Sequence, residues 1–177
     1  MVGVAGIQLS RYFGAAPLIG TSGSPEKAGK LSSLGLDRVV DYRKENIGDA
    51  AREATGGRGV DVIVDHVGGL LLKDTLRALA VKGRLISVGR LGQALGELDM
   101  ELLALNRLRV IGVTFRTRTL EEKTAIVQGV IADLLPAVAD GRLCPVVDRV
   151  FALEDAKEAH KYMASGKQVG KIVLRAD

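Results

Sequence analysis

The sequence has few of the residues from which disulfide, zinc or membrane chemistry is built. Its single cysteine, Cys144, excludes a disulfide within the chain and leaves no Cys-x-x-Cys zinc motif, and no other metal-ligand cluster stands out. We expect Cys144 to be a small buried residue beside Pro145 rather than a reactive thiol. No apolar run could span a bilayer and the N-terminus lacks the features of a signal peptide, so we expect a cytoplasmic protein with no membrane partner.

Aromatic residues and clusters of charge are also scarce. Aromatics make up 3% of the 177 residues and tryptophan is absent, so the core has to be built from Val, Ile, Leu and Ala. The net charge of +4 would suit an anionic partner. The basic residues are nevertheless scattered and not interleaved with aromatics. This pattern argues against nucleic acid and leaves either a solvated basic surface or a phosphorylated small molecule.

Strand and helix signals alternate along the chain. Short apolar runs predict strands at residues 15–20, 39–42, 60–67, 84–89, 108–115, 149–153 and 171–175. Amphipathic stretches predict helices at residues 3–13, 25–34, 46–54, 70–80, 99–106, 120–140 and 154–164. Ser24 is expected to cap the second helix, and Pro136 to interrupt the long one. Apolar strands that alternate with helices indicate a doubly wound parallel sheet of the α/β class.

Small and hydroxyl residues near the N-terminus are candidates for binding phosphate. Gly3 and Val4 are typical of the end of a glycine-rich loop, whose backbone N–H groups bind pyrophosphate at a helix N-terminus. The next predicted strand leads into Thr21 and Ser22, with no acidic residue nearby to hold the ribose hydroxyls of NAD. Lys27 lies one turn into the following helix, where a cation suits the 2′-phosphate of NADP, although an exposed helix lysine is an equally good interpretation.

Two later turns follow strands and are expected at one edge of the sheet. The strand of residues 60–67 leads into Val67 and Gly68, and the strand of residues 84–89 ends in Val88 and Gly89. Ligands of open α/β sheets bind at the carboxyl ends of the strands, so these turns are expected to line a cofactor. His66 is a candidate acid, but lining the turn is the better interpretation, and we assign no catalytic residue.

Together these motifs resemble the medium-chain dehydrogenase/reductase superfamily, and most of all its zinc-free quinone oxidoreductase branch. The matching stretches are residues 3–9, 20–27, 40–43, 55–62, 65–69, 83–89 and 153–174. The resemblance implies a Rossmann-like domain over residues 1–142 that binds NADPH. In the family such a domain serves hydride transfer to quinones or conjugated enones. Residues 143–177 would form a tail that packs onto a separate catalytic domain.

The resemblance also implies roles for single residues. Lys27 and Tyr42 are expected to contact the 2′-phosphate, Phe115 and Arg116 to lie near the nicotinamide, and Lys171 to reach the cofactor from the tail. The family commonly forms homodimers through the edge strand of the sheet, which here is residues 108–115.

The family pattern also has parts that this sequence lacks. Met1 stands where the family has a loop glycine, and neither the first, central strand nor the N-terminal barrel-like catalytic domain is present. Without that strand, the strands at 15–20 and 60–67 lose a shared neighbour, at a cost of about 1–3 kcal/mol per unpaired buried group. We therefore expect a truncated sequence, a gap that the strands close in another way, or a second chain that fills it. A catalytically inactive cofactor-binding or dimerisation module, and an enoyl reductase domain acting on acyl chains, remain as alternatives.

Overall fold

The computed structural model describes residues 2–176. The chain divides into two compact units, one formed by the residues up to Val39 together with those from Gln128 onward, the other by Val40–Val127. The strands form three separate sheets, ordered β1-β2, β3-β4-β5 and β6-β7. The strand pairs of the second and third sheets are parallel, and helices alternate with strands throughout, which confirms the predicted α/β class.

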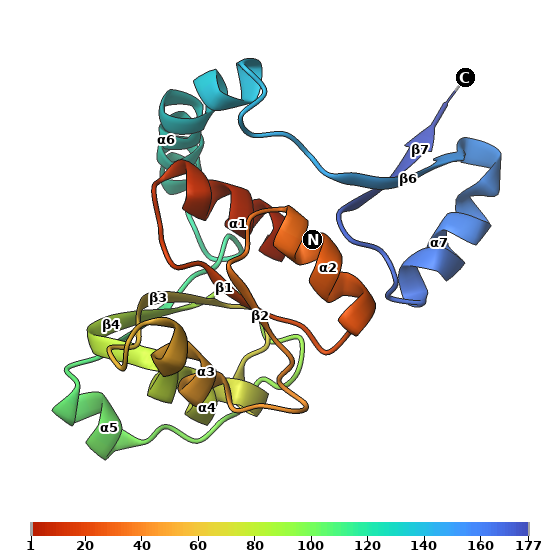
Figure 1. The fold of residues 1–177 in the computed structure, drawn as a ribbon. Coiled ribbons are helices and arrows are strands. Elements are labelled where there is room, and N and C mark those ends of the chain that lie inside the picture. The colour runs from red at the N-terminus through yellow and green to blue at the C-terminus, as the bar shows by residue number, and fades with distance from the viewer. Residues whose placement is uncertain (1, 177) are drawn as a thin grey trace. The chain divides into compact units, whose positions relative to one another are not determined.

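The first unit combines the N-terminal elements with the tail (Figure 1). It contains α1 (Val2–Tyr12), β1 (Ile19–Thr21), α2 (Pro25–Ser33), β6 (Val147–Ala152), the 3₁₀ helix η2 (Leu153–Asp155), α7 (Ala156–Ala164) and β7 (Lys171–Arg175). Two further elements, β2 (Arg38–Val40) and α6 (Leu120–Ala139), cross the boundary between the units. Gly14 and Gly35 follow α1 and α2 with φ of 76° and 109°, and so they act as the predicted helix stops.

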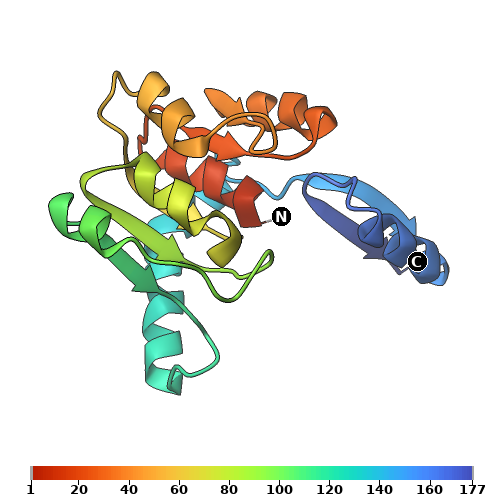
Figure 2. The same ribbon diagram turned by 90° about the horizontal axis from the view of Figure 1, so that it is seen from below.

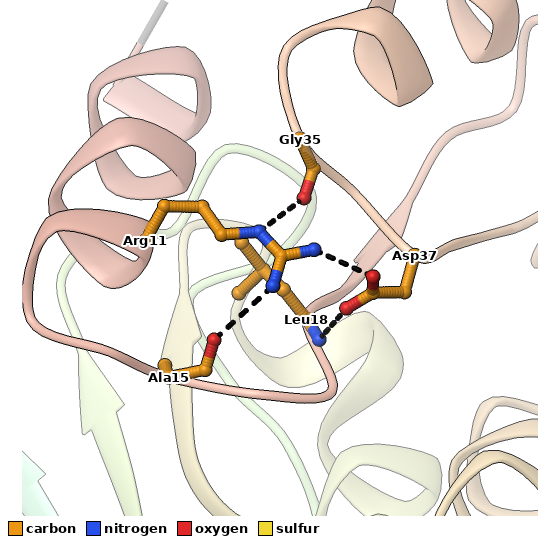
Figure 3. Close-up of polar contacts among 5 residues, drawn as sticks. All are labelled: Arg11, Ala15, Leu18, Gly35 and Asp37. Carbon is orange, nitrogen blue, oxygen red and sulfur yellow. Dashed lines mark hydrogen bonds and ion pairs between the residues drawn. The ribbon is translucent and has the colours of Figure 1, made fainter.

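An arginine on α1 fixes the start of the first two strands (Figure 3). Arg11 Nε donates to the Gly35 carbonyl at 2.7 Å, and Arg11 Nη2 lies 2.6 Å from Asp37 Oδ1. The other carboxylate oxygen of Asp37 accepts from the Leu18 backbone N–H at 2.6 Å. This backbone hydrogen bond, and then Arg11, hold the pKa of Asp37 below its usual value. Because Leu18 precedes β1 and Asp37 precedes β2, the network secures the amino ends of both strands.

A buried aspartate joins the tail to α2 within the first unit. In the tail, β6 and β7 pair in parallel around α7 (blue in Figure 2). The Asp148 side chain is 6% exposed, and it accepts from the Tyr162 hydroxyl at 2.7 Å and from the Val169 backbone N–H at 3.2 Å. Lys30 of α2 reaches the same carboxylate at 3.3 Å. The Tyr162 hydrogen bond is the main cause that lowers the pKa of Asp148.

This lowered pKa makes the stability of the tail sensitive to acid. A carboxylate whose pKa is depressed by folding stabilises the fold fully above its unfolded value of about 4, and the stabilisation is lost as pH falls through the lower folded pKa. We expect Asp148→Asn to melt earlier than the wild type at neutral pH, with a difference that shrinks below about pH 4. Thermal melts over a pH series test this, with Asp155→Asn as the control. A difference that is independent of pH would contradict it.

The second unit is a three-stranded parallel sheet with helices that cover one face (Figure 1). It contains α3 (Ile47–Ala54), β3 (Val60–Asp65), the 3₁₀ helix η1 (Gly69–Leu71), α4 (Leu72–Ala78), β4 (Leu79–Ser87), α5 (Met100–Leu105) and β5 (Arg109–Gly112). Its core is aliphatic, as the scarcity of aromatics predicts, and consists of the buried residues Leu76, Leu79, Leu85 and Leu108. Asn46 and Asp99 cap α3 and α5 through their side chains.

The register of this sheet brings the strand ends to one level. Asp65 of β3 pairs with Ser87 of β4, and Ser87 pairs in turn with Gly112 of β5. All three strands run in the same direction, so the segments that follow them leave the sheet at the same edge. The register therefore determines which loops can meet.

The start of β4 differs from the sequence-based prediction. The sequence predicts that residues 79 and 80 end a helix and that Lys82-Gly83 forms a turn before the strand. The structure instead begins β4 at Leu79, because Leu79 and Ala80 are buried and Leu79 pairs with Val60. The expected turn survives as an irregularity inside the strand, where Lys82 has a φ of 66° and donates its N–H to the Asn106 carbonyl.

Two smaller expectations, on Pro136 and on Cys144, are also wrong, whereas the predicted position of Ser24 is confirmed. Pro136 does not interrupt α6, which runs through it to Ala139, because the hydrogen bonding continues beyond it: the Pro136 carbonyl accepts from the Asp140 N–H. Ser24 is the N-cap residue of α2 and Pro25 opens the helix, as predicted, although the Ser24 side chain makes no capping hydrogen bond. Cys144 is exposed, because the Gln8 side chain pairs with its backbone N–H and carbonyl and holds the segment at the surface.

The two strands expected to flank the missing central strand each keep an unpaired edge within residues 2–176. There, β1 bonds only to β2, and β3 bonds only to β4. The two strands do not pair with each other, so the described chain does not close the gap that the sequence predicts at the position of the central strand.

Candidate functional site

The candidate site lies at the carboxyl edge of the β3-β4-β5 sheet in the second unit. Of the residues predicted to contact a cofactor, Val67 and Gly68 follow β3, and Val88 and Gly89 follow β4. The structure brings these two turns together directly. The backbone N–H groups of Val88 and Gly89 both donate to the Asp65 carbonyl, at 2.9 and 3.0 Å. The prediction that both turns occupy one edge of the sheet is therefore confirmed.

Glycine is required where the turns approach each other. A Cβ atom on Gly89 would lie 2.6 Å from the His66 carbonyl oxygen, closer than real contacts allow. Gly68 has a φ of 84°, and a Cβ there would lie 2.5 Å from the Gln93 carbonyl oxygen. These glycines let the two backbones pack without side chains between them, and Gly68 is buried. The two glycines are therefore required by the packing of one loop against the other, which holds both turns at the edge of the sheet.

The loop after β4 continues this backbone packing. Gln93 pairs with Gly68 in an isolated bridge, and the Gln93 carbonyl accepts from the Gly69 N–H at 2.9 Å. Further along, Gly69 and Gly96 approach so closely that a Cβ on Gly69 would overlap the Leu95 carbonyl. Residues 65–69 and 87–96 therefore form one interlocked pair of loops, which we call the double turn.

The loop after β5 begins beside the double turn. The Val113 N–H donates to the Ser87 carbonyl at 3.1 Å, which places the start of this loop against the end of β4. Phe115 is 56% exposed. Arg116 is also exposed and makes no ion pair with any residue from 2 to 176. An aromatic face and a free guanidinium are thus available near the same edge of the sheet.

The first unit holds most of the other predicted contacts. Gly3 and Val4 lie in the first turn of α1, with Gly3 exposed and Val4 only 7% exposed, so Val4 can offer a ligand little beyond its main chain. A Cβ on Gly3 would touch nothing within 4 Å, so packing inside the described chain does not explain this glycine. Thr21 ends β1 with an exposed side chain.

Two cations of the first unit are free to meet an anion. Lys27 sits in the first turn of α2, where the helix dipole also favours negative charge, and it has no ion-pair partner among the described residues. Lys171, at the start of β7, is exposed and likewise unpaired within residues 2–176. The Ser22 hydroxyl is committed to Ser24, which leaves Thr21 as the hydroxyl available at this strand end. Tyr42, in the second unit just after β2, is 38% exposed.

The double turn also contains His66, the candidate acid predicted from the sequence. His66 is partly buried in the double turn, and its backbone carbonyl accepts from the Leu91 N–H; neither observation involves the imidazole, so its lining role stays a prediction. Among residues 2–176, no cluster of His, Cys, Asp or Glu could hold a metal ion. Within the same residues, no helix has both the length and the apolar character that a bilayer crossing requires. The first unit offers two cations that are unpaired in the described chain and the first-turn N–H groups of α1, and the second unit offers an exposed guanidinium and an aromatic ring, which are features with which proteins hold nucleotides.

Sequence reasoning missed one residue of this site. Asp65 is 6% exposed, and its carboxylate accepts from the Val67 N–H at 2.8 Å and from the Gly68 N–H at 3.1 Å. An aspartate that is followed by glycine at a strand end is typical of a side chain that bonds its own loop, and this signal was available in the sequence.

The fold and these strand-end turns define a Rossmann-like cofactor-binding domain, and comparison with known proteins identifies its family. A sequence model described as zinc-binding dehydrogenase matches residues 34–174. The chain therefore belongs to the zinc-binding dehydrogenase family, within the medium-chain dehydrogenase/reductase superfamily.

Individual relatives agree with this assignment. A phenolphthiocerol/phthiocerol polyketide synthase of Mycobacterium tuberculosis is 33% identical over 98% of this chain and 8% of its own length. Quinone oxidoreductase-like protein 2 of Bos taurus is 28% identical over 97% of this chain and 49% of its own length. The chain thus spans about half the length of the quinone oxidoreductase-like relative that it matches.

Solved structures show the same fold. An NAD-dependent alcohol dehydrogenase superposes with a TM-score of 0.81 at 32% identity, covering 99% of this chain and 48% of that protein. A mycobacterial protein solved in complex with NADPH superposes with a TM-score of 0.79 at 29% identity, covering 98% of this chain and 54% of that protein. The Rossmann-like class predicted from the sequence is therefore confirmed.

Proposed function

We propose that this chain is the cofactor-binding part of an oxidoreductase that holds NADPH and reduces quinones or conjugated enones. The observation that carries the proposal is the double turn, in which Val67, Gly68, Val88 and Gly89 form one backbone surface at the carboxyl edge of a parallel sheet. The NADPH complex of a similar structure and the quinone oxidoreductase-like relative support the choice of cofactor and substrate class. The proposal places the protein in the cytoplasm.

The residues would divide the work of holding the cofactor. Gly3 and Val4 would offer backbone N–H groups at the start of α1 to the pyrophosphate. Thr21 and Ser22 would line the adenosine ribose, with Thr21 supplying the free hydroxyl, and Lys27 and Tyr42 would contact the 2′-phosphate. Lys171 would add a further contact from the tail.

The double turn, Phe115 and Arg116 would orient the nicotinamide and exclude water from it. The cofactor supplies hydride chemistry when bound, and this chain supplies position and charge.

Self-association belongs to the same proposal. In the described part of the chain, β5 pairs only with β4, and all four of its residues are exposed. A homodimer through this edge would satisfy the free backbone groups of β5.

A fluorescence titration of the purified chain with NADPH and with NADH tests the proposal. We expect NADPH to bind with a dissociation constant well below about 1 mM, and more tightly than NADH. Circular dichroism has to show that the protein in the titration is folded. Absence of binding to either nucleotide by folded protein would refute the proposed function.

Two other functions give different results in a simple assay. An enoyl reductase domain acting on acyl chains is favoured by the 33% identical polyketide synthase, and it would reduce an acyl enoyl thioester in preference to a quinone. A catalytically inactive binding or dimerisation module would bind NADPH and reduce neither substrate. Turnover of a simple quinone and of an enoyl thioester with NADPH separates the three.

A further inference from the structure

The buried carboxylate of Asp65 lies at the centre of the double turn. Its Oδ1 accepts from the Val67 N–H at 2.8 Å, and both of its oxygens lie 3.1 Å from the Gly68 backbone nitrogen. No cation pairs with this carboxylate among residues 2–176. Backbone N–H groups therefore compensate a charged side chain that is only 6% exposed. Burial of a carboxylate costs free energy unless hydrogen bonds of this kind compensate it.

The backbone of the same residue holds the second turn. The Asp65 carbonyl accepts from Val88 and Gly89, so that one residue bonds the backbone of four positions predicted to line the cofactor. The side chain shapes the turn after β3, and the carbonyl draws the turn after β4 against it. The glycine contacts at Gly68 and Gly89 tolerate no side chain, and so a small displacement of one turn has to move the other.

We infer that Asp65 is a positioning residue for the nicotinamide end of the cofactor site, an inference that rests on the proposed function. Asp65 does not touch the cofactor. It sets the conformation of Val67 and Gly68 through its carboxylate, and through their packing it sets the position of Val88 and Gly89. The free protein therefore already holds the double turn in its binding conformation, and binding does not have to order it.

Two substitutions at this position separate positioning from general stability. Asp65→Ala removes both acceptors and leaves the Val67 and Gly68 N–H groups unpaired. Asp65→Asn keeps one acceptor oxygen and places an amide donor close to the Gly68 nitrogen, so it preserves part of the bonding and the size of the side chain. Asp61→Asn is the matched control, because Asp61 lies on the same strand, is exposed and bonds Arg58 instead.

We expect NADPH affinity to fall about tenfold or more in Asp65→Ala and about threefold in Asp65→Asn, and to stay unchanged in Asp61→Asn. Backbone amide exchange should accelerate at residues 66–69 and 87–93 and nowhere else in the second unit. Wild-type affinity in a folded Asp65 variant would overturn the inference, and so would an exchange increase spread over the whole unit. If Asp65→Ala does not fold, Asp65→Asn alone decides by the same two criteria.

The two measurements also separate this inference from the proposed function. Failure of the wild-type chain to bind NADPH or NADH would refute the function, and amide exchange would then decide alone whether Asp65 holds both turns. Binding by the wild type, together with unchanged exchange in both variants, would refute the role of Asp65 and leave the function standing.

Discussion

Replacement of Leu76 by alanine is expected to lower the free energy of unfolding of the second unit by about 2–5 kcal/mol. Leu76 on α4 is fully buried and belongs to the cluster with Leu79, Leu85 and Leu108 that joins the helix layer to the sheet. Truncation removes buried methyl groups and leaves a cavity, which the packed strands on the other side cannot fill by moving. Urea unfolding followed by circular dichroism measures the change.

The control for this prediction is Leu105→Ala on α5. Leu105 is 71% exposed, so the same chemical change there should alter the unfolding free energy by no more than about 0.5 kcal/mol. Equal losses in the two variants would show that the aliphatic cluster does not hold this unit together.

Replacement of Lys27 by alanine is expected to weaken NADPH binding about 30-fold and to leave NADH binding within about twofold of the wild type. Lys27 is partly buried, has no ion-pair partner among residues 2–176, and lies in the first turn of the helix that follows β1. The two cofactors differ only in the 2′-phosphate, so a cation that contacts this group affects one and spares the other. Parallel titrations with both nucleotides provide the measurement.

The control removes a positive charge elsewhere in the same unit. Lys157 on α7 is exposed, and Lys157→Ala makes the same change in net charge. Its affinity for both cofactors should match that of the wild type. A similar loss for NADPH and NADH in Lys27→Ala would refute the assigned contact, and a selective loss in Lys157→Ala would point to a long-range effect of charge.

The alternation of elements could be predicted because its signals are local. Two signals were sufficient to predict the order of the elements: glycines that follow helix ends, and apolar runs as long as a strand. Most predicted bounds lie within a few residues of the observed ones, and those of β7 agree. The start of β4 could not be predicted, since the apolar residues Leu79 and Ala80 suit a buried helix or a buried strand equally well. Pairing of Leu79 with Val60, a contact across the sheet, decides between them.

The candidate site was predictable where it depends on topology alone. Parallel strands place their carboxyl ends together, so the meeting of Val67-Gly68 with Val88-Gly89 follows from the strand order. Only part of the role of Asp65 could be derived in this way: an aspartate before glycine at a strand end indicates a side chain that bonds its own loop, but the link to the turn after β4 depends on how the loops pack. Burial of that carboxylate is a property of the folded loops and has no signature in residue spacing.

The exposed thiol of Cys144 has a practical consequence for all of these experiments. The chain has no tryptophan and three tyrosines, so its own emission is too weak to follow unfolding or nucleotide titration conveniently. With a single cysteine that is accessible at the surface, a maleimide dye attaches at one defined position. Because the Gln8 side chain bonds the backbone of this residue, the fluorophore would report when α1 and the start of the tail come apart.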